Sequence, residues 1–205
     1  MTFLTLLPMA FVMIAGPQIL SAIFLATSES WQRNSLAYIA GATISITAFV
    51  TAAYYLSTGA RDAGAGNNTI YIVVLVLLVG AMVHVFLKRG ESEPPGWMGK
   101  LQTASAGFSF KLGLLLLGIF PTDILTSVAM GSYLASHGDP WWHSIPFIAL
   151  TVLLLALPLL LLLAFRKRAQ AALPKVRAWM TDNSWVVNEI VLLLFVALTI
   201  SSIAG

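Results

Sequence analysis

The stretch Gly16-Pro17-Gln18-Ile19-Leu20-Ser21 interrupts the first long apolar segment of this chain, and Phe120-Pro121-Thr122-Asp123-Ile124-Leu125-Thr126 interrupts the fourth. Each proline lies near the middle of a segment that is long enough to cross a bilayer, and polar side chains follow it. Broken helices at corresponding positions in the two halves of a membrane protein indicate a transport site. The two breaks therefore distinguish this chain from a simple membrane anchor.

The composition is that of an integral membrane protein with almost no soluble part. Of 205 residues, 59% are hydrophobic and 9% are charged, whereas about 25% of the residues in a soluble domain are charged. The net charge of +3 does not indicate a nucleic-acid partner, because the basic residues flank apolar segments, as topology signals do. The chain has no cysteine, which excludes disulfides, thiolate metal sites and thiol redox chemistry.

The apolar segments predict an all-α membrane protein with six transmembrane helices, each close to the ~20 residues that a bilayer requires. The predicted spans are 3–26, 36–57, 70–88, 108–135, 143–165 and 185–204. They form one transmembrane domain over residues 1–205, with a first repeat over 1–90, a connecting loop over 88–107 and a second repeat over 108–205.

The basic residues predict the orientation. The loops after spans one, three and five, with the adjoining helix ends, hold Arg33, Lys88, Arg89, Lys100, Lys111, Arg166, Lys167, Arg168, Lys175 and Arg177. The remaining loops and both termini hold only Arg61. By the positive-inside rule, the first set of loops is cytoplasmic. We therefore expect a multi-pass protein of the cell (inner or plasma) membrane with both termini outside the cytoplasm.

Two sets of three helices predict an inverted repeat, because an odd number of spans makes the second set run opposite to the first. In such repeats the binding site lies near the midplane, where the discontinuous helices meet. The predicted substrate-binding residues are Gly16, Pro17, Gln18, Ser21, Pro121, Thr122, Asp123 and Thr126. Two triplets also enclose little volume, which makes a homodimer plausible.

A proline lacks the N–H that would bond four residues back, and its ring clashes with that carbonyl. The carbonyls freed in this way, at Met13 and Leu117, need a partner such as a neighbouring helix, a hydroxyl, a water or a substrate. A single break would be explained by an ordinary proline kink. Two breaks at matching positions, each followed by polar residues, favour a functional site.

Asp123 is the only ionisable residue that lies deep in a predicted span. A carboxyl at that depth is costly unless it pairs, is protonated or lines a wet cavity. The sequence favours a proton-coupling, cation-coupling or headgroup-binding role for Asp123. A structural hydrogen bond to Thr122, Thr126 or a neighbouring helix is the alternative.

Other polar residues have simpler explanations. In span two, Gly41 and Ser45 are spaced for close helix packing. His137, Asp139 and His143 carry ligand-type side chains but lack a tight spacing motif, so we predict no metal site there. The chain has no hydrolase elbow, phosphate loop or HExxH run, which predicts a protein that is not an enzyme and has no cofactor.

Taken together, four features resemble the lysine exporter (LysE) superfamily, and most closely its GAP family of peptidoglycolipid and sulfolipid addressing proteins. They are Gly16-Pro17, Pro94-Pro95-Gly96-Trp97, the run from Gly113 to Phe120 before Pro121, and the final helix from Trp185 to Gly205. The resemblance covers nearly the whole chain. It implies two inverted triplets with broken first and fourth helices, and a transporter or export accessory for lipids or glycolipids.

Other branches of the superfamily export amino acids or metal ions. This chain lacks the sequence features that are typical of those branches. It has no paired cysteines and no His-rich loop. Amino-acid exporters typically have Asn-Pro-Lys at the second break, whereas this chain has Phe120-Pro121-Thr122-Asp123.

We therefore expect an exporter of a lipid-like or amphipathic small molecule, with membrane lipids as partners. The alternatives are an exporter of a polar solute or cation and a non-transporting accessory subunit of a lipid export system. A lipid path should show a lateral apolar opening, and a solute path an enclosed aqueous one.

Overall fold

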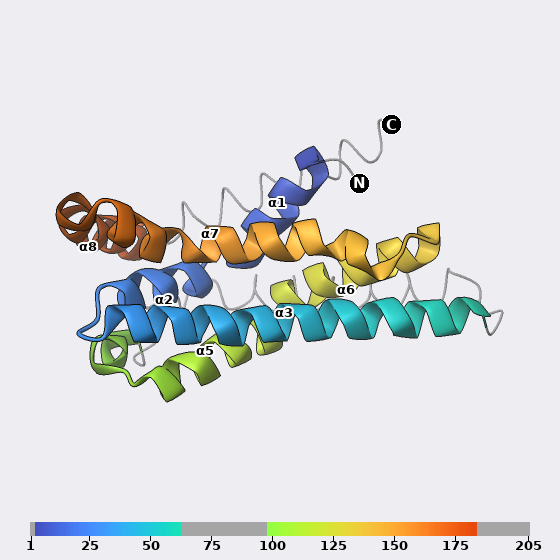
Figure 1. Ribbon diagram of the computed structural model, residues 1–205, viewed down its shortest axis with the longest axis horizontal. Helices are drawn as coiled ribbons and strands as arrows, with labels where there is room; N and C mark the ends of the chain where they lie inside the picture. Colours follow the sequence, from blue (N-terminus) through green and yellow to red (C-terminus); the bar gives the residue numbers. More distant parts are fainter. Residues whose placement is uncertain (1–2, 63–97, 184–205) are drawn as a thin grey trace.

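The computed structural model describes residues 3–62 and 98–183, and within these ranges every regular element is helical (Figure 1). The elements are α1 (Phe3–Ile14), α2 (Pro17–Ala26), α3 (Trp31–Asp62), the 3₁₀ turn η1 (Met98–Thr103), α5 (Ala106–Ile119), α6 (Pro121–His137), the 3₁₀ turn η2 (Trp141–Ser144), α7 (Ile145–Ala164) and α8 (Arg166–Asp182). The predicted spans 70–88 and 185–204 lie outside the described residues.

Four of the predicted spans can be compared with the structure. Trp31–Gly59 and Trp141–Ala164 are each long and apolar enough to cross a membrane as single helices. The described residues hold up to four spans if α1 with α2, and α5 with α6, each count as one broken span. The chain is therefore an all-helical membrane protein, as predicted.

Both proline breaks are present. The axes of α1 and α2 differ by 69° across the break, and those of α5 and α6 by 67°. Pro17 and Pro121 each occupy the first turn of the helix that follows. A proline is tolerated there because its missing N–H would have no helical partner in any case. The prediction of two broken helices at these prolines is confirmed.

Each of the two long helices packs against helices from the other half of the sequence. α3 lies along α5 and α6, while α7 packs against α1 and α2 (Figure 1). Each long helix therefore supports the broken helix that belongs to the other half of the chain. Tyr38, Ile46, Leu117 and Phe147 are among the fully buried side chains of the resulting core.

α3 and α5 approach each other at two glycines. A methyl group on Gly41 would clash with the backbone of Phe110, and one on Gly113 would clash with the backbone of Tyr38. Small residues permit such backbone-to-backbone contact between membrane helices. The packing role predicted for Gly41 is confirmed.

The basic segment after the fifth predicted span was expected to be a loop, but it forms the helix α8. Ala169 and Leu173 are buried and pack with Ile23, Ala26 and Leu162. Their spacing of one helical turn gives α8 one apolar edge, so its basic residues are left on the other faces. The assignment as a loop was wrong because a narrow apolar stripe is hard to see beside five cations and an internal proline.

Candidate transport site

The two broken helices meet side chain to side chain. Gln18, in the first turn of α2, donates a hydrogen bond from Nε2 to Oδ2 of Asp123 over 2.6 Å. Asp123 lies in the first turn of α6. Gln18 is 1% exposed and Asp123 is 0% exposed. The structure thus joins two predicted site residues that are 105 positions apart in the sequence.

Local backbone geometry aims these side chains at each other. Gly16, which precedes α2, has a φ of 96°, a value that residues with a Cβ rarely adopt. At the other break, the carbonyl of Phe120 accepts from the N–H groups of Asp123 and Ile124, each over 3.1 Å. Each second half-helix therefore starts abruptly, with Gln18 or Asp123 in its first turn.

Neighbouring hydroxyl groups complete the contacts around this pair. The hydroxyl of Tyr38 on α3 donates to the carbonyl oxygen of Gln18 over 2.9 Å. The Thr122 hydroxyl lies 3.4 Å from Oδ1 of Asp123. Thr126 instead donates to the Thr122 carbonyl over 2.7 Å, within its own helix. The neighbouring-helix hydrogen bond that the sequence left open for Asp123 is thus present, with Gln18 as its partner.

Three buried polar atoms near the junction have no hydrogen-bond partner among the described residues. They are Oε1 of Gln18, Oγ of Ser21 and Oγ of Ser127. Ser21 follows Gln18, and Ser127 follows Asp123, by about one helical turn. Because buried polar groups are nearly always paired, these atoms provide places where a water or a polar group of a ligand can bind.

The helix ends add an electrostatic contribution. α2 and α6 both begin at the junction, which places the positive ends of two helix dipoles close to Gln18 and Asp123. In transporters with broken helices, such N-termini point at anionic groups of the substrate. The junction can therefore hold a negatively charged or strongly accepting group.

The predicted site residues fall into two sets. Gln18 and Thr122 each contact Asp123 at the junction, and Gly16, Pro17 and Pro121 form the backbone of the two breaks. Ser21 and Thr126 lie one turn further along their own helices.

Sequence reasoning missed Tyr38 and Ser127. Tyr38 resembles an ordinary core aromatic within an apolar span, and Ser127 lies just outside the quoted motif. The only available signal for Tyr38 was the hydroxyl group, which needs a partner when it is buried.

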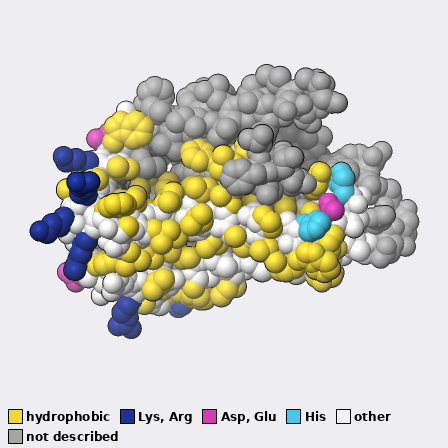
Figure 2. All heavy atoms as spheres, turned by 45° about the horizontal axis from the view of Figure 1, so that its top comes forward, with side chains coloured by type: hydrophobic (Ala, Val, Ile, Leu, Met, Phe, Trp, Pro, Cys, Tyr) yellow, Lys and Arg dark blue, Asp and Glu magenta, His cyan; other side chains and the backbone are white. Residues whose placement is uncertain are grey.

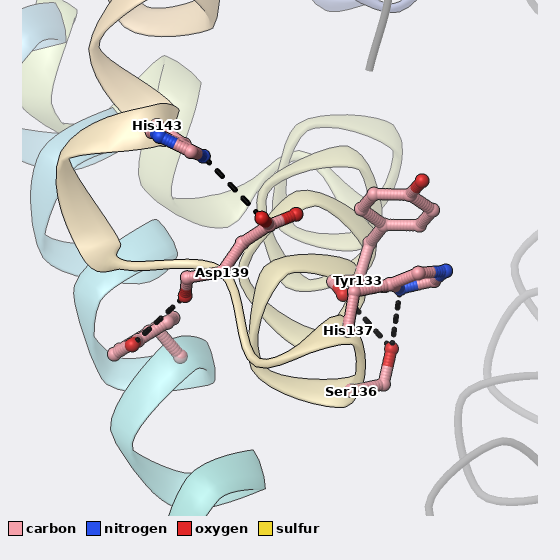
Figure 3. A network of polar contacts seen from close by, with 6 residues as sticks. Tyr133, Ser136, His137, Asp139 and His143 are labelled. Atoms are coloured by element: carbon pink, nitrogen blue, oxygen red, sulfur yellow. Dashed lines mark hydrogen bonds and ion pairs between the residues drawn. The ribbon is translucent and has the colours of Figure 1, made fainter.

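The His137, Asp139 and His143 cluster is held by contacts within the protein (Figure 3). Nδ1 of His143 lies 3.5 Å from Oδ1 of Asp139. His137 stacks on Tyr133 with ring centroids 4.0 Å apart, and its Nδ1 is 2.9 Å from the Tyr133 carbonyl oxygen. Within residues 3–62 and 98–183, no three His, Cys, Asp or Glu residues are grouped to hold a metal ion.

An apolar groove of about 260 Å³ lies between α3 and α7. The residues that line it are Thr43, Thr47, Trp141, Ile145, Ile148, Ala149 and Val152. The groove does not include the Gln18–Asp123 pair. It is a separate, lateral feature of the helix bundle.

The apolar spanning helices and the two broken pairs define an all-helical integral membrane protein. The chain belongs to the SfLAP family, whose model is described as "Sap, sulfolipid-1-addressing protein" and matches residues 6–203. The resemblance to the sulfolipid addressing proteins is thereby confirmed. No curated protein and no solved structure matches the chain.

Proposed function

We propose that this protein exports a lipid-like, amphipathic molecule across the cell membrane, and that the junction of Gln18 and Asp123 is its midplane site. The observation that carries the proposal is the buried hydrogen bond between the two helix breaks. The family description, which names sulfolipid addressing, supports a lipid as the cargo. The description names no catalysis, in keeping with the absence of enzyme motifs.

In this proposal the hydrogen bond represents the closed state of the path. A polar headgroup that enters the junction takes over the Nε2 donor of Gln18 and releases Asp123. The unpaired atoms of Gln18, Ser21 and Ser127 then offer further hydrogen bonds to the headgroup. Because the headgroup replaces contacts that the protein already makes, its desolvation on entering the site is offset.

The lateral groove favours a lipid over a polar solute. Its lining is apolar, and it lies between two spanning helices, where an acyl chain can rest while the headgroup occupies the junction. The reciprocal packing of α3 on α5 and α6, and of α7 on α1 and α2, supports the proposal of two inverted triplets. Alternating access would then move one half against the other around the fixed site.

The direct test is a lipid-flipping assay in proteoliposomes, in which dithionite bleaches a fluorescent lipid that has reached the outer leaflet. We expect Asp123→Asn, Asp123→Ala and Gln18→Ala to reduce the protein-dependent rate by about tenfold or more, which corresponds to about 1.4 kcal/mol. Asp139→Asn is the matched control, because its carboxyl lies in the separate cluster beside His143. Full transport by both Asp123 variants at equal protein density would exclude the proposed role of Asp123.

The same vesicles separate the alternatives. Flux of amino acids or cations without lipid movement would contradict the lipid proposal and indicate a solute exporter. A wild-type protein that moves neither, and whose Asp123 variants change only its assembly with a larger exporter, would indicate an accessory subunit.

A further inference from the structure

A second groove, of about 220 Å³, lies at the opposite end of α7 from the first. Trp31 and Gln32 from the start of α3, Leu162 and Leu163 from the end of α7, and Arg166 at the start of α8 line it. None of these residues belongs to the Gln18–Asp123 junction.

The lining changes from apolar to cationic along the groove. Leu162 is 3% exposed and belongs to the apolar cluster beneath α8, while Leu163 is 59% exposed. The side chains of Arg166 and Gln32 are exposed, and neither side chain forms a hydrogen bond or ion pair with the residues that the structure describes. The groove therefore combines an apolar wall with unoccupied donors at its rim.

The surrounding charge is strongly positive. Arg166, Lys167, Arg168, Lys175 and Arg177 all lie on α8. In Figure 2 the Lys and Arg side chains gather at one end of the molecule, which is the end where α7 joins α8 in Figure 1. A cationic surface at the end of a spanning helix attracts anionic lipid headgroups.

The two grooves lie on one face of the α3–α7 pair. On α3, Thr43 of the first groove follows Gln32 of the second by eleven residues, and on α7, Leu163 follows Val152 by eleven. Eleven residues make close to three full turns, so residues at this spacing share a helix face and lie roughly 16 Å apart along the axis.

We propose that the groove at Trp31, Gln32 and Arg166 is a binding site for an anionic lipid. The phosphate or sulfate of the headgroup binds Arg166 and Gln32, and an acyl chain runs over Leu163 toward the apolar groove at Thr43 and Val152. The indole of Trp31 suits the boundary between headgroup and chain, because it has an apolar body and one polar N–H. The proposed lipid binding is independent of the proposed export function. A role of this site in taking up the exported lipid would rest on that function.

The test is native mass spectrometry of the full-length protein in detergent, titrated with dioleoyl phosphatidylglycerol. We expect Arg166→Ala to weaken retention of the first bound lipid about tenfold, and Gln32→Ala to weaken it less. Arg168→Ala is the matched control: it removes an exposed cation from the same helix without touching the groove. Its affinity should stay within about twofold of wild type, since a cation on this surface is screened by salt.

Three further arms identify the source of the anion and the specificity of the site. Dioleoyl phosphatidylcholine should bind without dependence on Arg166, and inorganic sulfate or glycerol phosphate at equal concentration should not displace phosphatidylglycerol. Equal binding by Arg166→Ala and wild type, or an equal loss in Arg168→Ala, would overturn the proposal. Efficient displacement by sulfate would overturn it in favour of a free-anion site.

The binding assay is independent of transport. If Arg166→Ala loses lipid binding but flips lipid at the wild-type rate, the groove is a lipid-binding site that has no role in taking up the exported lipid. Loss of flipping in the Asp123 variants with lipid binding unchanged would support the export function separately.

Discussion

A glutamine and an aspartate separated by 105 residues share one short hydrogen bond, and both are almost completely shielded. Leaving a buried polar group without its partner costs about 1–3 kcal/mol. The pair therefore contributes to holding α2 and α6 together, whatever else it does. In the proposed export cycle, such a pair would make the site selective, because only a group that can replace the lost hydrogen bond would open it.

A double-mutant cycle measures this coupling. Gln18→Ala, Asp123→Ala and the double variant should show an interaction free energy of about 0.5–3 kcal/mol in chemical unfolding of the detergent-solubilised protein. The double variant should be less destabilised than the sum of the single variants, because each single change strands the other partner. Strict additivity would show that the two side chains do not interact in solution.

Gly16 tests the geometry of the first break. Its φ of 96° makes alanine unfavourable there even though the nearest atom, Oε1 of Gln18, is 3.5 Å from the position of the added methyl group. We expect Gly16→Ala to cost about 1–3 kcal/mol of stability and to lower the thermal unfolding midpoint.

Gly59→Ala is the control for this change. No atom lies within 4 Å of the methyl group that it would add, and alanine is favoured over glycine in a helix by roughly 1 kcal/mol. Its unfolding midpoint should stay equal or rise. Equal midpoints for Gly16→Ala and wild type would contradict the strained backbone at the break.

The sequence identified Gln18 and Asp123 separately but not as partners. Depth along a helix follows from counting residues, whereas the direction in which each side chain points depends on how the two broken helices bend. The bends are 69° and 67°, and the broken helices pack against α7 and α3, which are contacts between distant segments that no local pattern encodes.

At the scale of whole elements, α3 and α5 approach each other closely at their glycines. Gly41 and Gly113 face each other's helix backbones, and Gly118 lies beside the hydroxyl of Ser45. Contacts of this kind replace side-chain interdigitation, and dispersion between backbones stabilises the pair in lipid.

We expect Gly113→Ala to be strongly destabilising, because the nearest atoms to the added methyl group are backbone atoms of Tyr38 and Ala42, which cannot rotate away. Overpacking of this sort typically costs about 1–3 kcal/mol. Gly107→Ala on the same helix adds its methyl group to open space and should behave as wild type. Thermal unfolding monitored by intrinsic fluorescence compares the two, and equal stability of the variants would argue against the close crossing.

Local signals predicted some elements better than others. Proline in an apolar segment predicted both breaks, and glycine spacing predicted the α3 contact, because each effect arises from the residue itself. α8 was missed because its stability comes from two apolar residues that pack on α2 and α7, and that partner surface exists only in the folded bundle.

At the scale of the whole molecule, the basic side chains are distributed unevenly between the two ends of the helix bundle. Lys and Arg side chains gather at one end of the visible face, and the His side chains at the other, whereas acidic side chains are seen at both ends (Figure 2). By the positive-inside rule, we expect α8 to lie in the cytoplasm and η2 outside it.

This orientation can be tested directly, since the natural chain has no cysteine. Trp142 is 63% exposed at one end, and Arg168 is exposed at the other. In intact cells, a membrane-impermeant maleimide should label Trp142→Cys, whereas Arg168→Cys should react only after permeabilisation. The reverse pattern would place α8 outside the cytoplasm.

In the proposed export cycle, the glycine crossing of α3 and α5 would act as a fulcrum. Where two helix backbones touch, the helices can rotate about the contact but cannot slide far past each other. The displacement of a residue therefore grows with its distance from the contact along the helix. Ile119, where α5 ends, lies six residues beyond Gly113, or roughly 9 Å along the helix. A rotation of about 10° at the crossing would shift that end by roughly 1.6 Å, which suffices to stretch a 2.6 Å hydrogen bond beyond its working range. A small pivot at two glycines would thus part Gln18 from Asp123.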